Sequence, residues 1–178
     1  MNDLCVGIDL GTTNSVLATI NEKPNGDIVS KVVEISRAVD MYNAVSGEAK
    51  LTTMKKPTLP SCVYYRQEKN YEPLVGDFAK MQYPLRPHLV AKSIKSQMGR
   101  SVAEGLSPDI PDKTPAQISA RILKHLLREA SKVYRCDIKD AVITVPANFD
   151  SAMCKATRDA AELAGIKVKN DDGTERAV

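Results

Sequence analysis

The residues with the clearest chemical potential lie near the N-terminus, in the string Val-Gly-Ile-Asp-Leu-Gly-Thr-Thr-Asn-Ser at positions 6–15. A short apolar run ends in Asp9 and then turns through Gly11 into small hydroxyl and amide side chains. Because Gly11 has no Cβ, the backbone there can approach a ligand closely. The amides of Gly11, Thr12 and Thr13 can then converge on an anion, as in other backbone concavities. The spacing therefore predicts a phosphate-binding turn.

Asp9 has a different chemical role in such a turn. Its carboxylate would repel a phosphate, but it suits a divalent metal held through water, or the orientation of an attacking water. For a bare Asp-x-Gly-Thr string the alternative is an ordinary hairpin, because Gly and Thr are common in turns. The chain contains neither a Walker Gly-Lys-Ser/Thr string nor a Gly-x-Gly-x-x-Gly string.

Composition narrows the class of protein. The 178 residues are 43% hydrophobic and 26% charged, as is typical of a soluble globular protein. A net charge of +3, with six Tyr, two Phe and no Trp, argues against a nucleic-acid partner. No apolar run is long enough to span a membrane, and no signal peptide is recognisable. The four irregularly spaced cysteines favour neither a zinc site nor a disulfide framework, so we expect a reduced, cytoplasmic setting.

Two helices have well-marked ends. The first begins at Thr114-Pro115-Ala116-Gln117, a capping box with proline at the first helical position. The second begins at Asp150 or Ser151 and ends at Gly165. The first pattern indicates a structural helix without chemistry, whose buried face carries Ile118, Ile122, Leu126, Ala130 and Val133. The expected inner face of the second helix carries Met153, Ala156, Ala160 and Leu163.

Other segments are predicted from apolar patterning. We expect a further helix over Leu89–Met98, closed by Gly99, and a strand over Asp140–Val145 that is covered on both faces. Residues 36–60 lack a clear pattern and predict an exposed loop or insertion, and 101–113 predict a loop. Further strands are expected before and after the turn within 4–21, and at 28–35, 61–66, 74–76, 166–169 and 176–178, with a turn at 170–173 and a helical turn from Asp77.

Six further strings follow the phosphate turn. They are Leu-Pro-Ser, Val-Gly-Asp-Phe-Ala-Lys, Ile-Lys-x-x-Met-Gly-Arg, Thr-Pro-x-Gln-Ile-Ser, Ala-Val-Ile-Thr-Val-Pro-Ala and Ala-Thr-x-Asp-Ala, starting at positions 59, 75, 94, 114, 141 and 156. In kind and order, they and the turn resemble the DnaK-type heat-shock protein 70 (Hsp70) chaperones of the actin-like ATPase superfamily. The resemblance covers most of the chain apart from residues 36–57.

The resemblance implies the N-terminal lobe of a nucleotide-binding (ATPase) domain. Its fold would be α/β, with an actin-like (ribonuclease H-like) mixed sheet flanked by helices and a smaller inserted α+β subdomain. Residues 1–36 and 113–178 would form the core subdomain, and residues 37–112 the inserted accessory subdomain. The second lobe and any substrate-binding domain are expected to lie outside this chain, so the fragment alone is expected to be inactive.

The resemblance also assigns roles within the turn. Asp9 matches the family's carboxylate that organises water and Mg²⁺, the metal being held through water. Thr12 and Thr13 match the hydroxyls beside the β- and γ-phosphates of ATP or ADP, with Thr12 nearest the γ-phosphate. Gly11 and Asn14 complete the cofactor-binding turn. Asp9 and Thr12 therefore belong to the expected catalytic set.

A lysine and a proline outside the turn complete the expected set. Lys95 matches the lysine that reaches the γ-phosphate and the attacking water, and Pro146 matches a proline of the relay between nucleotide and substrate domains. The chain has Asn148 where the family usually has an aromatic residue, and Cys154 in place of an arginine of that relay. Coupling to a peptide-binding domain is therefore open. We expect Cys154 to be a small buried filler.

These features imply an ATPase in the full-length protein, in which water attacks a Mg-bound γ-phosphate. Its partners would be client polypeptides and co-chaperones, without nucleic acid or membrane. Two alternatives remain open. A small-molecule kinase of the same superfamily would transfer the phosphate to a sugar or acetate. A non-catalytic nucleotide-dependent interaction module would fit the loss of arginine at position 154.

Overall fold

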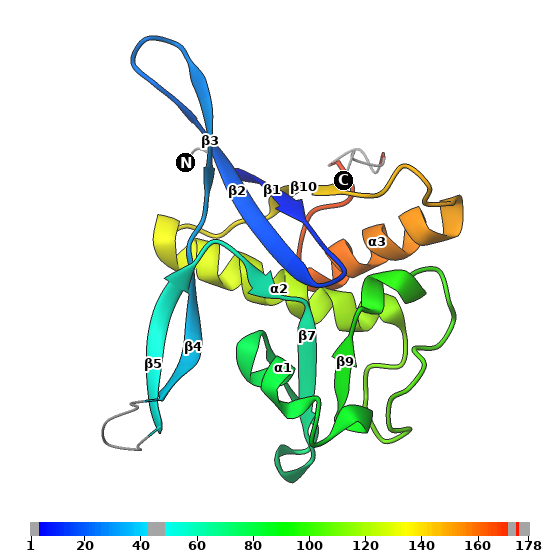
Figure 1. Ribbon diagram of the computed structural model, residues 1–178. Helices are drawn as coiled ribbons and strands as arrows, with labels where there is room; N and C mark the ends of the chain where they lie inside the picture. Colours follow the sequence, from blue (N-terminus) through cyan, green and yellow to red (C-terminus); the bar gives the residue numbers. More distant parts are fainter. Residues whose placement is uncertain (1–3, 43–48, 171–173, 175–178) are drawn as a thin grey trace.

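The computed structural model describes residues 4–42, 49–170 and 174, which form a mixed α/β structure (Figure 1). The larger sheet has the order β10-β1-β2-β3, and β6 also pairs with β2. Strands β1 and β10 are parallel, whereas β2 is antiparallel to its neighbours. The strands are β1 (Cys5–Asp9), β2 (Asn14–Glu22), β3 (Ile28–Val32), β6 (Leu59–Pro60) and β10 (Asp140–Thr144).

A smaller sheet and a hairpin follow the first three strands. The sheet has the order β8-β7-β9 and is antiparallel, with β7 (Cys62–Arg66) in the middle, β8 (Glu72–Val75) and β9 (Val90–Lys92) at its edges, and α1 (Asp77–Gln82) against β7. The hairpin consists of β4 (Ile35–Tyr42) and β5 (Ala49–Lys56). Three 3-10 turns complete this part: η1 (Gln67–Lys69), η2 (Pro87–Leu89) and η3 (Ile94–Gln97).

Helix α2 (Pro115–Tyr134) connects the two sheets, since it contacts β2 of the larger sheet and β7 and β8 of the smaller one (Figure 1). Its buried face carries Ile118, Ile122 and Leu126, as predicted. Helix α3 (Ser151–Ala164) packs along α2. The burial of the apolar stripe of α2 between the two sheets is the main reason that residues 115–134 form a helix.

The predicted helix ends are confirmed. Thr114 Oγ1 accepts a hydrogen bond from the Gln117 amide at 3.2 Å, and Gln117 Oε1 accepts one from the Thr114 amide at 3.0 Å. Asp150 caps α3 in the same way through the Met153 amide, and Gly165 ends α3 in the left-handed conformation. These helix ends could be predicted from the sequence because capping depends only on residues that are neighbours in the chain.

Two predicted core positions are wrong. Val133 is 55% exposed and Leu163 is 56% exposed. The buried stripe of α3 consists of Thr157, Ala160, Ala161 and Ala164, so it is rotated from the predicted face. Small side chains on that stripe allow α3 to lie close to α2, which leaves the larger Leu163 at the surface.

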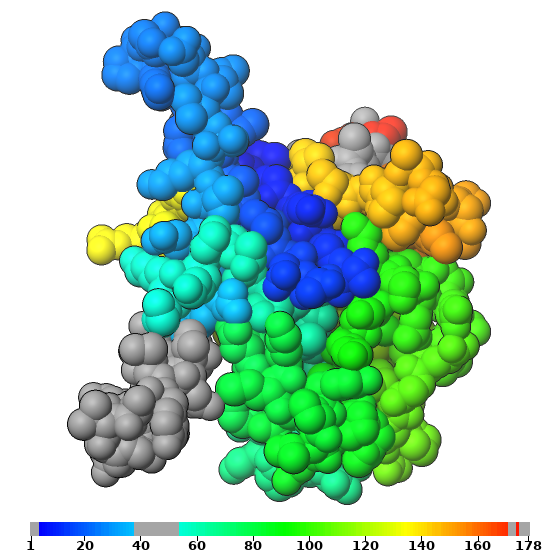
Figure 2. All heavy atoms as spheres, viewed as in Figure 1, coloured from blue at the N-terminus to red at the C-terminus, as the bar shows by residue number. Residues whose placement is uncertain are grey.

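The larger sheet has one covered and one open face. Val6, Ile8 and Leu17 point towards the buried side, while Gly7, Ile20 and Val142 lie on the exposed side. The prediction that residues 140–145 form a strand covered on both faces is therefore wrong for this chain, since Val142 is 54% exposed. The β2–β3 hairpin projects from the body of the molecule (Figure 1, Figure 2).

Of the two alternatives predicted for residues 36–60, an exposed loop or an insertion, the loop is wrong for residues 36–42 and 49–56, which form strands. Strands β4 and β5 pair antiparallel from Ile35 opposite Lys56 to Tyr42 opposite Ala49. Likewise, the strand expected over 28–35 ends at Val32, and Ile35 already belongs to β4. The Arg37 guanidinium anchors the hairpin by pairing with Asp77 and donating to the Thr58 carbonyl. Backbone pairing of this kind leaves little apolar periodicity in the sequence.

Other expected strands have mixed outcomes. The strands predicted at 61–66 and 74–76 are present at 62–66 and 72–75, and the predicted helical turn from Asp77 is present as α1. Residues 101–113 contain neither helix nor strand, as predicted. Residues 166–169 form no extended strand, although the Lys167 amide donates to the Lys139 carbonyl beside β10. Residues 171–173, in the predicted turn, and the strand predicted at 176–178 lie outside the described residues.

A partly buried polar triad ties the smaller sheet to α2. The Tyr65 hydroxyl donates to Asp112 Oδ2 at 2.8 Å, and the Arg121 guanidinium donates to both oxygens of the same carboxylate at 2.8 Å. Asp112 is only 6% exposed. Burial, and then the charge of Asp112, raise the pKa of Tyr65, so the phenol remains a donor at neutral pH.

We expect Asp112→Ala to lower the free energy of unfolding by about 2 kcal/mol, because the buried Tyr65 hydroxyl would lose its acceptor. Urea unfolding of the chain followed by circular dichroism measures the change. Asp109→Ala is the matched control, since Asp109 is exposed in the same loop and makes only 3.4 Å contacts with Ser107. Equal unfolding midpoints for the two variants would contradict a stabilising role of the triad.

Candidate functional site

The predicted phosphate turn joins β1 to β2. Thr12, Thr13 and Asn14 are exposed at its tip, and the dark blue turn lies on the surface in Figure 2. Its base is fixed from the other side, because the Ser61 amide donates to the Thr13 carbonyl at 2.9 Å and the Ser15 and Ser61 hydroxyls are 2.9 Å apart. The turn is thus held rigidly below and open to solvent above, which suits an anion site.

Gly11 is required by the shape of the turn. A Cβ at this position would lie 2.0 Å from the carbonyl oxygen of Asn14 and 3.2 Å from the Asn14 carbonyl carbon. The backbone therefore folds back on itself so closely that any side chain would force the turn open. The space that a side chain would take is filled by the Asn14 carbonyl group, so the fold of the turn itself requires glycine at this position.

Asp9 lies at the carboxyl end of β1, beside the carboxyl end of β10. The parallel register places Asp9 opposite Thr144, and Thr144 Oγ1 donates to Asp9 Oδ1 at 3.0 Å. This hydrogen bond holds the carboxylate while leaving the side chain exposed. Sequence reasoning missed Thr144. The available signal was that Asp9 ends one predicted strand and Thr144 is the last residue but one of another, and parallel strands end at the same edge of a sheet.

Lys95 does not lie on an α-helix, contrary to prediction. Residues 90–92 form β9 and residues 94–97 form the 3-10 turn η3, with Ser93 between them in the left-handed conformation. Leu89 and Val90 are buried, and β9 pairs with β7, so sheet pairing prevails over helical periodicity. Gly99 follows with a φ of +85°.

The η3 segment packs against the connection between β10 and α3. The Lys95 ammonium lies 5.8 Å from the centroid of the Phe149 ring, within the range of a cation–π contact. The α carbon of Gly99 faces the start of α3, since a Cβ there would lie 3.3 Å from Met153 Cγ. Phe149 was also missed from the sequence, because only the fold brings it to Lys95.

The structure thus pairs two predicted residues with two that were missed: Asp9 with Thr144, and Lys95 with Phe149, at the two ends of the 144–149 segment. Among the described residues, no hydrogen bond or ion pair joins Lys95 to Asp9 or Thr12. Pro146 lies within the segment, half-buried, and its carbonyl accepts from the Phe149 amide at 3.0 Å. Contrary to prediction, Cys154 is exposed rather than a buried filler.

Comparison with known proteins identifies the family. The Hsp70 protein family matches residues 109–170. Two curated proteins named "Chaperone protein DnaK", from Mesomycoplasma hyopneumoniae and Thermotoga neapolitana, are each 39% identical to this chain, over 94% and 93% of its length. This chain belongs to the Hsp70 family. A third relative of the same name, from Deinococcus radiodurans, is 36% identical to this chain over 92% of its length.

The Hsp70 chain spans about a quarter of the length of these relatives, namely 23%, 24% and 25%. Among the residues that the structure describes, no three His, Cys, Asp or Glu side chains are grouped as a metal cage. A single carboxylate such as Asp9 is nevertheless a normal Mg²⁺ partner, since Mg²⁺ usually keeps several waters. No helix in the described part is long and apolar enough to cross a bilayer.

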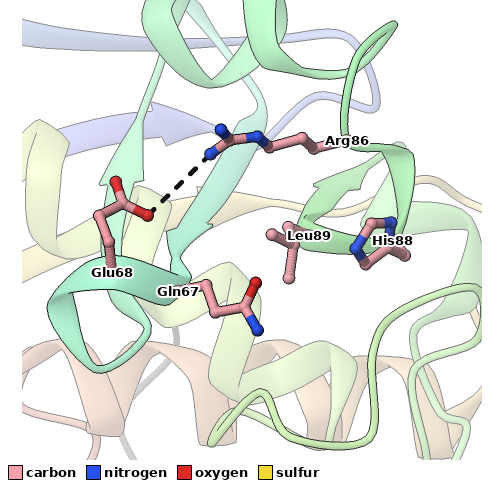
Figure 3. Close-up of a pocket in the computed structure, with 5 residues that line it drawn as sticks. All are labelled: Gln67, Glu68, Arg86, His88 and Leu89. Atoms are coloured by element: carbon pink, nitrogen blue, oxygen red, sulfur yellow. Dashed lines mark ion pairs between the residues drawn. The ribbon is translucent and has the colours of Figure 1, made fainter.

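A separate pocket opens on the smaller sheet of this Hsp70 chain (Figure 3). It is lined by Gln67, Glu68, Arg86, His88 and Leu89. Arg86 already donates to the Tyr64 hydroxyl at 2.6 Å and lies 4.0 Å from Glu68 across the pocket, as the dashed line shows. With its cation engaged in this way, the pocket is a weaker candidate for an anion than the open turn at Gly11.

Proposed function

We propose that this chain forms one side of a Mg-ATP site in the ATPase domain of an Hsp70 chaperone. The observation that carries the proposal is the turn at Gly11, whose backbone leaves no room for a Cβ, next to a carboxylate held by Thr144. This arrangement offers main-chain donors to phosphate and a carboxylate to the water shell of Mg²⁺. Both belong to the requirements of phosphoryl transfer.

We propose the following roles for the chain's own residues. The amides of Gly11 to Asn14 bind the phosphates, with the hydroxyls of Thr12 and Thr13 beside them. Asp9 orients water at the γ-phosphate and holds the hydration shell of the metal. Lys95 neutralises charge on the γ-phosphate. The bound Mg²⁺ supplies charge neutralisation on the phosphate oxygens, which is the main demand of this chemistry.

The domain division is proposed on the same basis. Residues 1–36 and 113–178 would form a core subdomain of actin-like type, and residues 37–112 an inserted accessory subdomain. The division is supported by two sheets that share no strand and by α2, which contacts both. The larger sheet is built from segments before residue 36 and after residue 112, except for the two residues of β6.

For the whole protein, we propose slow ATP hydrolysis coupled to the binding of client polypeptides, with co-chaperones as further partners. Pro146 would take part in the relay between domains, because its segment carries the partners of both Asp9 and Lys95. The arginine of the relay is absent, since Cys154 stands in its place and is exposed. Coupling in this protein would therefore depend on groups other than that arginine.

Nuclear magnetic resonance tests the nucleotide site directly on the isolated chain. We expect millimolar Mg-ATP to shift the backbone amide resonances of residues 11–14 and 144–149. One side of a nucleotide cleft should bind weakly, and only the residues near the nucleotide should respond. Mg-AMP is the matched ligand control and should leave the turn nearly unchanged, since it lacks the β- and γ-phosphates. Shifts confined to the pocket around His88, or no shifts at all, would contradict the proposed site.

A further inference from the structure

One short segment, residues 59–61, connects the phosphate turn to the smaller sheet. Its first two residues form β6 and pair with Asn14 and Ser15 at the start of β2. The third, Ser61, donates its amide to the Thr13 carbonyl at 2.9 Å and immediately precedes β7. The second half of the turn therefore lies against the chain that leads into the smaller sheet.

The side chain of Ser61 adds a second contact. Its hydroxyl lies 2.9 Å from the hydroxyl of Ser15, and both residues are buried. Because a buried hydroxyl without a partner is costly, each of these side chains holds the other in place. Ser61 thus contacts the turn through its backbone at Thr13 and through its side chain at Ser15.

Residues 59–61 are themselves fixed by packing and by a hydrogen bond. Leu59 is buried against Gly76, where a Cβ would lie 2.9 Å from Leu59 Cδ1. The carbonyl of the preceding residue, Thr58, accepts a hydrogen bond from the Arg37 guanidinium at 2.8 Å. A shift of the segment would disturb both contacts, so it gives the turn a firm support.

The contact with Thr13 also sets the direction of a neighbouring amide. In a trans peptide group the C=O and N–H bonds point to opposite sides, and the described residues contain no cis peptide bond. Because the Thr13 carbonyl points to Ser61, the Asn14 amide of the same peptide group points away from Ser61. The Asn14 amide is one of the donors that we propose to bind phosphate.

We propose that Ser61 is a positioning residue of the nucleotide site, an inference that rests on the proposed function. The Ser61 amide holds the Thr13 carbonyl and thereby orients the Asn14 amide towards the phosphates. The Ser61 hydroxyl keeps this contact in place by pairing with Ser15, two residues further along the chain. The chain that enters the smaller sheet thus supports a turn that belongs to the larger sheet.

Titration of the 178-residue chain with Mg-ATP, followed by the amide resonances of residues 11–14, tests the proposal. We expect Ser61→Ala to weaken binding about fivefold, the effect of losing one hydrogen bond. The double variant Ser15→Ala/Ser61→Ala separates positioning from stability. It leaves no unpaired hydroxyl, so its urea midpoint should recover most of the loss, whereas its affinity should stay about fivefold weaker.

Thr19→Val is the matched control. Thr19 is buried on the same strand as Ser15, and its hydroxyl lies 2.8 Å from the hydroxyl of Tyr134 on α2. This variant also loses a hydrogen bond between two hydroxyls, so it should be destabilised, but it should bind Mg-ATP within about twofold of the parent chain. Deuterium exchange adds a measurement without nucleotide. The Ser61 amide should exchange about tenfold faster in Ser15→Ala than in Thr19→Val, because the first change frees the segment locally.

Three results would overturn the inference while leaving the proposed function intact. They are parent affinity in Ser61→Ala, recovery of affinity together with stability in the double variant, and equal exchange of the Ser61 amide in Ser15→Ala and Thr19→Val. A parent chain whose turn does not respond to Mg-ATP would instead overturn the proposed function, and the role of Ser61 with it.

Discussion

Gly11→Ala is expected to abolish the response of the turn to Mg-ATP and to lower the free energy of unfolding by about 1–3 kcal/mol. The added Cβ would lie 2.0 Å from the Asn14 carbonyl oxygen, which belongs to the backbone and cannot rotate away as a side chain could. The turn must therefore open, which would displace the amides that we propose to bind phosphate. Urea unfolding measures the stability, and the amide shifts of residues 12–14 measure nucleotide binding.

Gly7→Ala is the matched control, two residues before Asp9 on the same strand. A Cβ at Gly7 would meet only the Ala18 carbonyl oxygen, at an ordinary 3.9 Å. We expect this variant to be as stable as the parent chain or slightly more stable, because alanine restricts the unfolded backbone. If both variants unfolded at the same urea concentration and bound Mg-ATP alike, the close approach at Gly11 would have no functional meaning.

Lys95→Ala is expected to lower ATP turnover by about 10² to 10³-fold while changing nucleotide affinity less than tenfold. Removing one group that stabilises developing charge typically has an effect of this size on the chemical step. The assay is single-turnover hydrolysis in a protein that carries the whole nucleotide cleft. A separate measurement of nucleotide affinity distinguishes an effect on chemistry from an effect on binding.

Lys92→Ala is the control for that variant. Lys92 is exposed on β9, three residues before Lys95, and its ammonium lies 3.7 Å from the centroid of the Tyr83 ring. It therefore resembles Lys95 in charge and in its aromatic neighbour, but that neighbour precedes β9 and is remote in sequence from the 144–149 segment. Hydrolysis at the parent rate by Lys95→Ala, or an equal loss in Lys92→Ala, would remove Lys95 from the catalytic set.

The parts of the fold that were predictable are those set by neighbouring residues. The capping box at Thr114 and the glycine after α3 determine where helices begin and end, whatever surrounds them. The predictions failed where the secondary structure depends on contacts with residues that are distant in the sequence. Val90 and Ala91 fit a helical stripe equally well, but pairing with β7 makes them part of a strand. The β4–β5 hairpin could not be predicted from the sequence either, because its strands pair through backbone hydrogen bonds.

The candidate site divides in the same way. The turn from Asp9 to Asn14 could be predicted because a close backbone approach demands glycine and small polar neighbours within a few residues. Thr144 and Phe149 could not, because each acts through a residue that is far away in the sequence. Only the parallel pairing of β1 with β10, and the packing of Lys95 and Gly99 on the residues from Phe149 to Met153, bring them to Asp9 and Lys95.

The hydrogen bond between Thr144 and Asp9 also has a consequence for protein synthesis. Its two residues are 135 positions apart, so β1 leaves the ribosome long before its parallel partner. At about 5–20 residues per second, β1 would wait roughly 7–27 s with one edge unpaired. During that interval the nascent chain exposes an open strand edge, which is a target for chaperones and a risk for aggregation.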